Sequence, residues 1–358
     1  MNAFIPAALA FIVCYATLRW LLRSKLARTT LDQPNHRSLH TTPTPRIGGL
    51  GVVVGVLGGG AVIAANLLEN PPTPNLQILL LLLALLSGFC FIDDKRGLSA
   101  AVRLPVHLLV ALLWVSCILN VSFLATFFIK VGAGDTAFHF LQSAIEHALA
   151  HPLLLLTLTL SLGWMMNLYN FMDGANGLAG GMAVFGFSAY STALYFSGQP
   201  ALAAFALAIA ASALAFLCFN FDPARIFLGD VGSISLGFLA GALGLWGWQS
   251  AAWPAWFPLL VFSPFIVDAT VTLFARALRG EKVWQAHRDH AYQRLIRMGW
   301  SHRRLALCAY ALMAACAASA LVLRVAPSAF VMAGITFWIL IYAALLGTVM
   351  WRWQGLKL

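Results

Sequence analysis

Charged residues are scarce in this chain. Only 9% of its 358 residues are Asp, Glu, Lys or Arg, whereas a soluble globular protein carries about 25%. So few charges cannot coat a water-facing surface, and hydrophobic residues make up 61% of the chain, which is more than a soluble fold can bury. The composition therefore excludes a soluble globular protein and a disordered chain, and it indicates a polytopic membrane protein.

Cysteine is also rare, and its positions show no metal or disulfide pattern. All six cysteines lie within apolar stretches, and no two of them form a Cys-x-x-Cys motif. We interpret them as small buried hydrophobes. Because the chain also lacks repeats and linkers rich in Pro, Gly or Ser, we expect a single transmembrane domain over residues 1–358.

Eleven apolar runs approach the length of about 20 residues that crosses a ~30 Å hydrocarbon core. They are Ala3–Leu22, Gly48–Leu68, Gln77–Ile92, Leu104–Ile129, Pro152–Leu168, Leu178–Phe196, Ala201–Phe219, Ile234–Trp248, Trp253–Ala275, Leu305–Leu323 and Phe330–Met350. The sequence predicts an all-α fold with about eleven transmembrane helices, or ten if one short run does not cross. The first run lacks the basic start and the cleavage site of a signal peptide, so we expect it to be retained.

Basic residues collect in alternate loops, which predicts the topology. They are Arg23, Lys25, Arg28, Arg37, Arg46, Lys95, Arg96, Arg103, Arg225 and a dense stretch from Arg276 to Arg304. The positive-inside rule places these loops in the cytoplasm and the N-terminus outside. The net charge of +10 is therefore a topology signal. Nucleic-acid binding would need one compact basic patch with aromatics, so we expect no nucleic-acid partner.

Four polar clusters fall at the predicted cytoplasmic helix ends, where we expect the active site. The first is Asp93-Asp94 at the end of an apolar run. Adjacent carboxylates repel one another, so such a pair is costly at a membrane boundary. It predicts either a divalent-metal or phosphate-activating site or a solvated helix end. Arg103 enters the next helix and could return to the same pocket as a phosphate ligand.

The second cluster repeats an oxygen-bearing side chain every third residue, at Asn167, Asn170, Asp173 and Asn176. On a helix this spacing forms one stripe, and Mg²⁺ prefers oxygen ligands. A polar seam between helices, with glycine packing, is the alternative interpretation.

The third cluster is a Gly-Asp-x-Gly-Ser turn at Gly229–Ser233. If it opens a helix, its free N–H groups can bind an anion, and Asp230 can hold a metal that bridges the same anion. Alternatively, Asp230 or Ser233 only caps the helix. Phe227 could stack on a base or anchor the helix end.

The fourth cluster, His287-Arg288-Asp289-His290, lies in the most basic loop. His and Arg together suit a pyrophosphate, whereas a zinc site has too few ligands here. Attraction to anionic lipid headgroups would explain the arginines but not the histidines. Asp268 stands apart inside an apolar run, where an acid indicates either function or a structural partner on a neighbouring helix.

Together these stretches resemble the polyprenyl-phosphate N-acetylhexosamine-1-phosphate transferases of glycosyltransferase family 4, the WecA and MraY group. The WbpL-type branch, which initiates O-antigen synthesis, is the most similar. The matching stretches are Pro43–Gly49, Asp93-Asp94, Asn167–Gly180, Phe227–Ser233 and His287–Gln293. They follow the family's order over most of the chain.

The resemblance implies a reaction and a location. A UDP-N-acetylhexosamine would donate its sugar 1-phosphate to undecaprenyl phosphate, giving undecaprenyl-pyrophosphoryl-N-acetylhexosamine and UMP. This is the initiating step of O-antigen, lipopolysaccharide or other cell-envelope polysaccharide synthesis, at the bacterial inner membrane. Mg²⁺ is the implied cofactor, with Mn²⁺ as the alternative. Which N-acetylhexosamine is used, and whether the chain forms a homodimer, stay open.

The resemblance also implies roles for individual residues. Asp230 and Asn170 would hold the metal. Asp93, Asp94 and Asp173 would be catalytic, with the Asp93-Asp94 pair engaging the lipid phosphate. The implied substrate-binding residues are Arg103 for phosphate, Phe227 and Asn176 for uracil, and His287, Arg288 and His290 for the pyrophosphate. Tyr292 and Gln293 stand where many relatives carry further histidines.

Two alternatives concern the mechanism and the class of protein. We predict direct attack of the lipid phosphate, positioned or deprotonated by Asp93, and an aspartyl-phosphate intermediate is the rival path. A secondary transporter of an anionic or nucleotide-linked substrate is the alternative function. A transporter would carry its charged site near the bilayer midplane, whereas the clusters here fall at one face.

Overall fold

The structure is a computed structural model that describes residues 4–34, 39–40, 42–65, 74–119, 152–283 and 287–355. Its longer helices are α1 (Phe4–Leu21), α3 (Gly48–Ala64), α4 (Pro74–Arg96), α5 (Ala100–Leu119), α8 (Pro152–Phe171), α9 (Leu178–Phe196), α10 (Pro200–Asn220), α11 (Gly229–Gln249), α13 (Ser263–Leu278), α15 (His302–Leu323) and α16 (Ser328–Gly355). The short elements are α2 (Lys25–Thr29), α12 (Trp256–Val261), α14 (Ala291–Arg297) and the strands β1 (Leu31–Asp32) and β2 (Thr44–Pro45).

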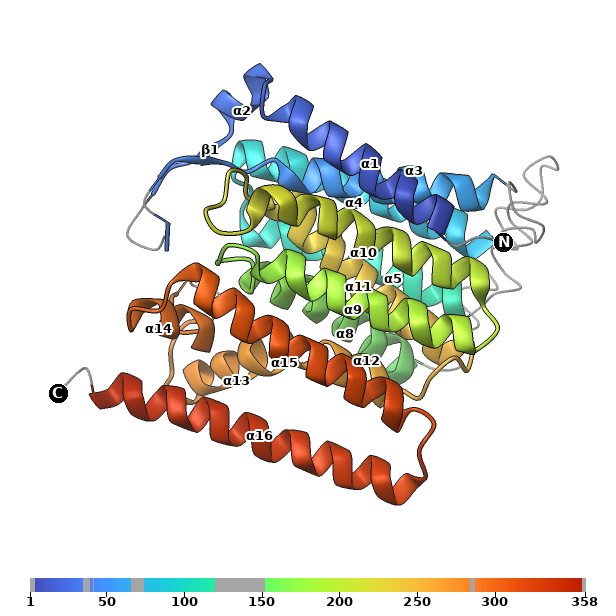
Figure 1. Cartoon of the computed structure of the whole chain (residues 1–358), viewed down its shortest axis with the longest axis vertical. Coiled ribbons are helices and arrows are strands. Elements are labelled where there is room, and N and C mark those ends of the chain that lie inside the picture. The colour runs from blue at the N-terminus through green and yellow to red at the C-terminus, as the bar shows by residue number, and fades with distance from the viewer. Residues whose placement is uncertain are drawn as a thin grey trace.

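Eight helices in the described ranges are long and apolar enough to cross a membrane, and α3 is a shorter apolar helix. The predicted all-α, polytopic membrane fold is confirmed. The helices lie side by side, and α2, β1 and α14 gather at one end of the bundle, which we call the polar end (left in Figure 1). The start of α1 and the end of α16 lie at opposite ends of the bundle. Of the predicted run Leu104–Ile129, the part beyond α5 lies outside the described residues.

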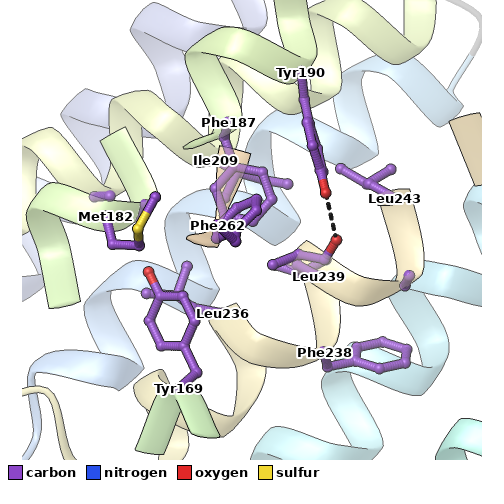
Figure 2. Packing of buried hydrophobic residues seen from close by; sticks show 14 of the residues in the cluster. Tyr169, Met182, Phe187, Tyr190, Ile209, Leu236, Phe238, Leu239, Leu243 and Phe262 are labelled. Atoms are coloured by element: carbon purple, nitrogen blue, oxygen red, sulfur yellow. Dashed lines mark hydrogen bonds between the residues drawn. The ribbon is translucent and has the colours of Figure 1, made fainter. Parts of the chain in front are cut away.

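The central helix is α11. Of its most apolar window, 83% is buried, and it contacts α3, α4, α5, α8 and α9. Figure 2 shows its Leu236 and Leu239 among aromatic side chains from neighbouring helices. The hydroxyl of Tyr190 donates a hydrogen bond to the carbonyl of Ala240 at 3.1 Å, because a buried hydroxyl in a bilayer must find its partner within the protein. A helix packed on all sides can fix the position of whatever its first turn carries.

One predicted helix is two helices in the structure. The apolar run Trp253–Ala275 divides into α12 and α13, with the break at Phe262. Pro264 lies in the first turn of α13, where its missing N–H costs nothing, whereas in a continuous helix it would remove a hydrogen bond. The hydroxyl of Ser263 donates to the carbonyl of Leu260 at 2.7 Å. The run has no charged residue at the break, so hydropathy alone gives no sign of it.

Backbone hydrogen bonds join the start of α3 to the start of α11. The N–H of Gly48 donates to the carbonyl of Phe227 at 2.8 Å, and that of Gly49 donates to Leu228 at 2.7 Å. The two helices then cross with Gly49 against Gly232, where a Cβ on either glycine would overlap the backbone of the other. This crossing places Arg46, just before α3, beside the first turn of α11.

We expect Gly49→Ala to destabilise the protein, because the added methyl forces α3 and α11 apart. Overpacking of this kind costs about 1–3 kcal/mol, which corresponds to a fall in Tm of about 1–4 °C for a chain of this size. Thermal unfolding in detergent measures it. The control is Gly88→Ala in α4, where a Cβ meets nothing within 4 Å. Equal Tm values for both variants would contradict the close crossing.

Candidate active site

Asp230, in the first turn of α11, lies at the centre of a charged cluster at the polar end. Its Oδ1 accepts a hydrogen bond from Asn170 Nδ2 at 2.9 Å and lies 3.5 Å from Arg46 Nη2. Its Oδ2 lies 3.4 Å from Arg103 Nη1. The cluster therefore joins residues from the loop before α3 and from α5, α8 and α11, and Asn170 also donates to Ser233 Oγ at 2.9 Å.

Arg46 links three carboxylates. Its guanidinium lies 3.7 Å from Asp32, 3.7 Å from Asp94 and 3.5 Å from Asp230. Burial lowers the pKa of Arg46, but the surrounding carboxylates outweigh burial and hold the pKa above its ordinary value. Arg46 is absent from the site residues that the sequence patterns predict, although it stands within the matching stretch Pro43–Gly49. Its partners are far away in the sequence.

The two adjacent acids of α4 point to different partners. The carboxylate of Asp94 accepts the backbone N–H groups of Asp230 at 3.3 Å and Val231 at 3.2 Å, so it caps the start of α11. Asp93 is only 3% exposed. It accepts the N–H of Leu98 at 2.8 Å and lies 3.5 Å from Arg103. The pair thus ties α4 to α5 and α11, and its role at a lipid phosphate stays a prediction.

The predicted helical stripe of Asn167, Asn170, Asp173 and Asn176 is only half correct. α8 ends at Phe171, so the first two residues are helical and the last two lie in the following loop. Gly177, with a φ of +76°, adopts a left-handed conformation that glycine accommodates most easily. Asn176 Nδ2 donates to Asp222 Oδ1 at 2.9 Å. Asp173 and Asn176 nevertheless line the same polar cleft as Asn170.

The carboxylate of Asp173 differs from those of Asp93, Asp94 and Asp230 in having no hydrogen bond or ion pair within the described part of the chain. Burial raises its pKa well above the ordinary value, and the charges of Asp230 and Asp94 raise it further, while Arg46 opposes them. Asp173 therefore keeps a proton to a higher pH than an ordinary aspartic acid. A carboxylate in this environment is available to a cation or a proton.

Arg46, Asn170 and Asp173 line a polar cleft of about 410 Å³. The predicted site residues Asp93, Asp94, Arg103 and Asp230 lie next to these residues but are not part of its lining. Of the predicted site residues, the lining includes Asn170, Asp173, Asn176, Phe227 and His287. It also includes residues that the sequence patterns do not predict, among them Asp32, His40, Arg46, Asn220 and His302. The half-buried ring of Phe227 meets His40 edge to face, with 4.8 Å between centroids, and forms one wall of the cleft.

Of the predicted residues His287, Arg288 and His290, only His287 lines the cleft. Burial, with the nearby His290 and Arg276, lowers the pKa of His287 to about 4, so its imidazole is neutral at pH 7. His290 is 3% exposed, with its ring stacked between Phe171 and Tyr292. The structure does not bring Arg288 to the cleft lining.

Asp268 explains why the histidine loop sits where it does. Its carboxylate accepts the backbone N–H groups of Ala291 at 2.8 Å and Tyr292 at 3.2 Å, together with the hydroxyl of Thr272 at 3.2 Å. The hydroxyl of Tyr292 donates to the carbonyl of Phe171 at 2.9 Å. Asp268 thus caps α14 from α13, and the structural alternative for this acid holds.

The cluster fits a divalent cation held by few protein ligands. Four carboxylates, those of Asp93, Asp94, Asp173 and Asp230, face the guanidiniums of Arg46 and Arg103, so negative charge is in excess. Asp230 and Asn170 are in contact, and Asp173 has unpartnered oxygens. In the described ranges no three His, Cys, Asp or Glu residues surround one metal position. Mg²⁺ is commonly held by one or two carboxylates, with waters and substrate phosphates completing its shell.

The sequence is similar to a family of known enzymes. A family model described as glycosyl transferase family 4 matches residues 76–247. A probable undecaprenyl-phosphate N-acetylglucosaminyl 1-phosphate transferase of Bacillus subtilis is 29% identical over 327 residues, which are 89% of this chain and 86% of that one. A decaprenyl-phosphate N-acetylglucosaminephosphotransferase of Mycobacterium tuberculosis is 30% identical over 81% of this chain and 74% of its own length. A phospho-N-acetylmuramoyl-pentapeptide-transferase of Staphylococcus aureus is 25% identical over 83% and 92%.

We expect Asp173→Asn to raise the Tm of the metal-free protein at pH 8 and to change it little at pH 4. The folded-state pKa of Asp173 is raised, so the folded wild type loses stability as pH rises from the unfolded pKa of about 3.9 through the folded pKa. The asparagine removes this loss. Thermal unfolding of the metal-free protein, from pH 4 to pH 8, measures it.

The control is an acid whose pKa is lowered in the folded protein. Hydrogen bonds from Arg279 and Arg276 lower the pKa of Glu281 to about 2, so its contribution to stability is present above its unfolded pKa and lost as pH falls toward 2. Glu281→Gln should therefore lower the Tm at pH 8. A lower Tm for Asp173→Asn at every pH would show that favourable contacts hold the charged form.

We expect Asp268→Ala to loosen α14. Two amides lose their acceptor, which costs about 0.5–2 kcal/mol at a helix start, so exchange of the Ala291 and Tyr292 amides should accelerate roughly 2- to 30-fold. Hydrogen exchange followed by mass spectrometry measures it. Thr272→Val, which removes only the hydroxyl that Asp268 accepts, should leave the exchange close to that of the wild type. Unchanged exchange in Asp268→Ala would refute the cap.

Proposed function

This chain belongs to glycosyl transferase family 4, and on that premise we propose that it transfers an N-acetylhexosamine 1-phosphate from a UDP-sugar to undecaprenyl phosphate. The products are undecaprenyl-pyrophosphoryl-N-acetylhexosamine and UMP. The observation that carries the proposal is the polar cleft at the helix ends. Arg46 and Asp173 line it, and Arg46 also contacts Asp230. The acceptor's isoprenoid tail can stay in the bilayer while its phosphate reaches this cleft.

We place the cleft on the cytoplasmic side of a bacterial inner membrane. The polar end carries the basic loops, and the positive-inside rule assigns those loops to the cytoplasm. The relatives described above come from bacteria. The reaction initiates a cell-envelope polysaccharide, and O-antigen is the polysaccharide that the sequence resemblance favours.

The two arginines bind phosphate groups. Both substrates are polyanionic, and transfer between phosphates depends mainly on positioning and on stabilising negative charge. Arg46 and Arg103 lie on either side of Asp230, so their guanidiniums are fixed before a substrate arrives. A preorganised guanidinium loses less entropy when it forms paired hydrogen bonds to a phosphate.

A divalent cation, Mg²⁺ with Mn²⁺ as the alternative, would be held by Asp230 and Asn170, with Asp173 as a further ligand or neighbour. When bound, it would polarise phosphoryl oxygens and offset their charge. The unpartnered oxygens of Asp173 and the excess of carboxylates support this assignment.

The nucleotide is bound by the part of the cleft that Phe227, Asn176 and His287 line. Phe227 offers an apolar face for uracil, and Asn176, held by Asp222, lies in the same lining. His287, neutral at pH 7, can donate one hydrogen bond to the pyrophosphate. Arg288 and His290 are not among the residues that line the cleft. Their predicted contacts with the pyrophosphate therefore require the loop to move when the nucleotide binds.

Transfer proceeds by direct attack. An oxygen of the polyprenyl phosphate bonds to the β-phosphorus of the UDP-sugar, the bond from that phosphorus to the bridging oxygen breaks, and UMP leaves with the bridging oxygen. The sequence favours Asp93 as the acid that positions or deprotonates the acceptor. We assign proton acceptance instead to Asp173, because its carboxylate lines the cleft and has no hydrogen bond or ion pair within the described part of the chain. Asp93 then orients Arg103.

We expect the purified protein to convert a radiolabelled UDP-N-acetylhexosamine and undecaprenyl phosphate into a chloroform-soluble product. A panel of UDP-sugars identifies the donor. Asp230→Asn should lower turnover by at least about 100-fold, since it removes one charge at the centre of the cluster. Glu281→Gln, an acid of the same end outside the cleft lining, should stay within about twofold of the wild type.

The same preparations provide two controls. Without lipid acceptor, the protein should gain no covalently bound label, and a trapped phosphosugar on the enzyme would overturn direct attack. In sealed vesicles, label that crosses the membrane without forming a lipid product would instead support a transporter.

A further inference from the structure

An apolar cavity of about 380 Å³ lies behind one wall of the cleft, between α13, α14, α15 and α16. Its lining includes Asp268, Tyr292, Leu295 and Cys308. Tyr292 lines the cavity and the polar cleft alike. Any molecule in the cavity therefore contacts a residue of the candidate active site from behind.

A second hollow, of about 640 Å³, adjoins the cavity at the polar end, between α14 and the last turns of α16. Leu295 and Trp300 line both spaces. The second hollow is also bordered by Trp351 and Arg352. The two spaces together offer an apolar interior with an amphipathic mouth, where aromatic rings and a cation meet.

Positive charge lies in and beside the mouth. Arg352 lines it, and two arginines of α14 lie against Trp353, the residue after Arg352. The guanidinium of Arg297 lies 4.4 Å from the centroid of the Trp353 ring, and that of Arg294 lies 6.0 Å from it. Arg294 Nε finds no hydrogen-bond partner among the described residues. Its acidic neighbour, Asp289, is 3.9 Å away. Cations beside tryptophans at a helix end are suited to a lipid phosphate at the bilayer interface.

The side chains of α16 do not fill the cavity. Only 11% of the most apolar window of this helix is buried, and the helix lies along the outer edge of the bundle (Figure 1). The hydroxyl of Tyr342 holds its middle, because it lies 2.7 Å from the hydroxyl oxygen of Ser263 and 3.3 Å from the sulfur of Cys316. An apolar space of this size excludes water and accepts an apolar guest. In a bilayer, hydrocarbon chains are the guests at hand.

We propose that the cavity and its mouth form a regulatory site for an anionic glycerophospholipid of the surrounding bilayer. One acyl chain fills the apolar cavity, and the phosphate meets Arg297 and Arg352. The bound chain supports Tyr292 and with it α14, which carries the histidine loop. The coupling to turnover rests on the function proposed above, whereas the lipid site itself does not.

The connection to the cleft runs through named hydrogen bonds. The backbone N–H of Tyr292 donates to the carboxylate of Asp268, and the hydroxyl of Tyr292 donates to the carbonyl of Phe171 at the end of α8. Gln293 donates to the same hydroxyl at 3.2 Å. Without the chain, α14 can shift toward the empty space, which displaces His287 and the loop that carries Asp173.

The occupant is a membrane phospholipid rather than the tail of the acceptor substrate. A lipid whose chain fills this cavity would place its phosphate at Arg297 and Arg352, on the far side of Tyr292 from Arg46 and Asp230. An acceptor bound there could not bring its phosphate to the cleft.

The test uses the full-length protein in nanodiscs of phosphatidylcholine with increasing phosphatidylglycerol. Native mass spectrometry counts the retained phosphatidylglycerol, and product formation gives kcat and the KM for undecaprenyl phosphate. The charge variant is Arg297→Gln with Arg352→Gln. Its matched control is Arg23→Gln with Arg28→Gln, two exposed arginines near and within α2 at the same end.

A second pair of variants tests the acyl-chain site separately from the phosphate site. Cys308→Trp fills the cavity, whereas Cys218→Trp introduces the same residue at the other exposed cysteine, which lies on α10 away from the cavity. Equal Tm values for the two tryptophan variants show that any difference in binding is not a folding defect.

We expect the wild type and both controls to retain phosphatidylglycerol and to gain about fivefold in kcat as its fraction rises, a coupling typical of regulatory sites. The arginine variant and Cys308→Trp should lose the retained lipid and the response. Equal lipid retention in all variants overturns the site, even if no turnover is detected. If the variants lose phosphatidylglycerol but kcat still rises with its fraction, the lipid does not regulate turnover. If Cys308→Trp retains the lipid but has a raised KM for undecaprenyl phosphate, the cavity binds the tail of the acceptor instead.

Discussion

The glycine-to-glycine crossing of α3 and α11 is the constraint on which the site depends. Backbone hydrogen bonds from Gly48 and Gly49 fix the start of α3 against the segment before α11, and the missing side chains of Gly49 and Gly232 let the two backbones touch. Arg46 and Asp230 each lie next to this crossing, so their contact follows from it. The surrounding helices then hold α11 in place, and Asp94 caps its first turn.

A second physical theme is the imbalance of charge at the polar end. Acids and arginines sit together where the dielectric constant is low, and the acids outnumber the arginines. Burial raises the pKa of Asp173, and the charges of Asp230 and Asp94 raise it further. A cation among these acids would offset their mutual repulsion. The protein keeps this arrangement because many packed helices supply the stability that the cluster removes.

The sequence was informative wherever one local pattern determined the outcome. Hydropathy predicts α9 at both of its ends, and the Gly-Asp-x-Gly-Ser turn does open a helix. Prediction stopped where contacts join distant segments. Nothing near Arg46 in the sequence reveals its three carboxylate partners, and nothing near Asp268 reveals that it caps a helix 23 residues further on. The break at Phe262 was invisible for another reason, because both sides of it are equally apolar.

The different bonding of Asp93 and Asp94 has a consequence for how genetic data on this chain should be interpreted. Each acid serves as a joint between helices, Asp94 with α11 and Asp93 with the turn into α5. A survey that records only lost growth would score alanine at either position as an essential active-site residue. The same score would arise from misassembly alone. Abundance in the membrane must therefore be recorded beside phenotype before either acid is counted as chemical machinery.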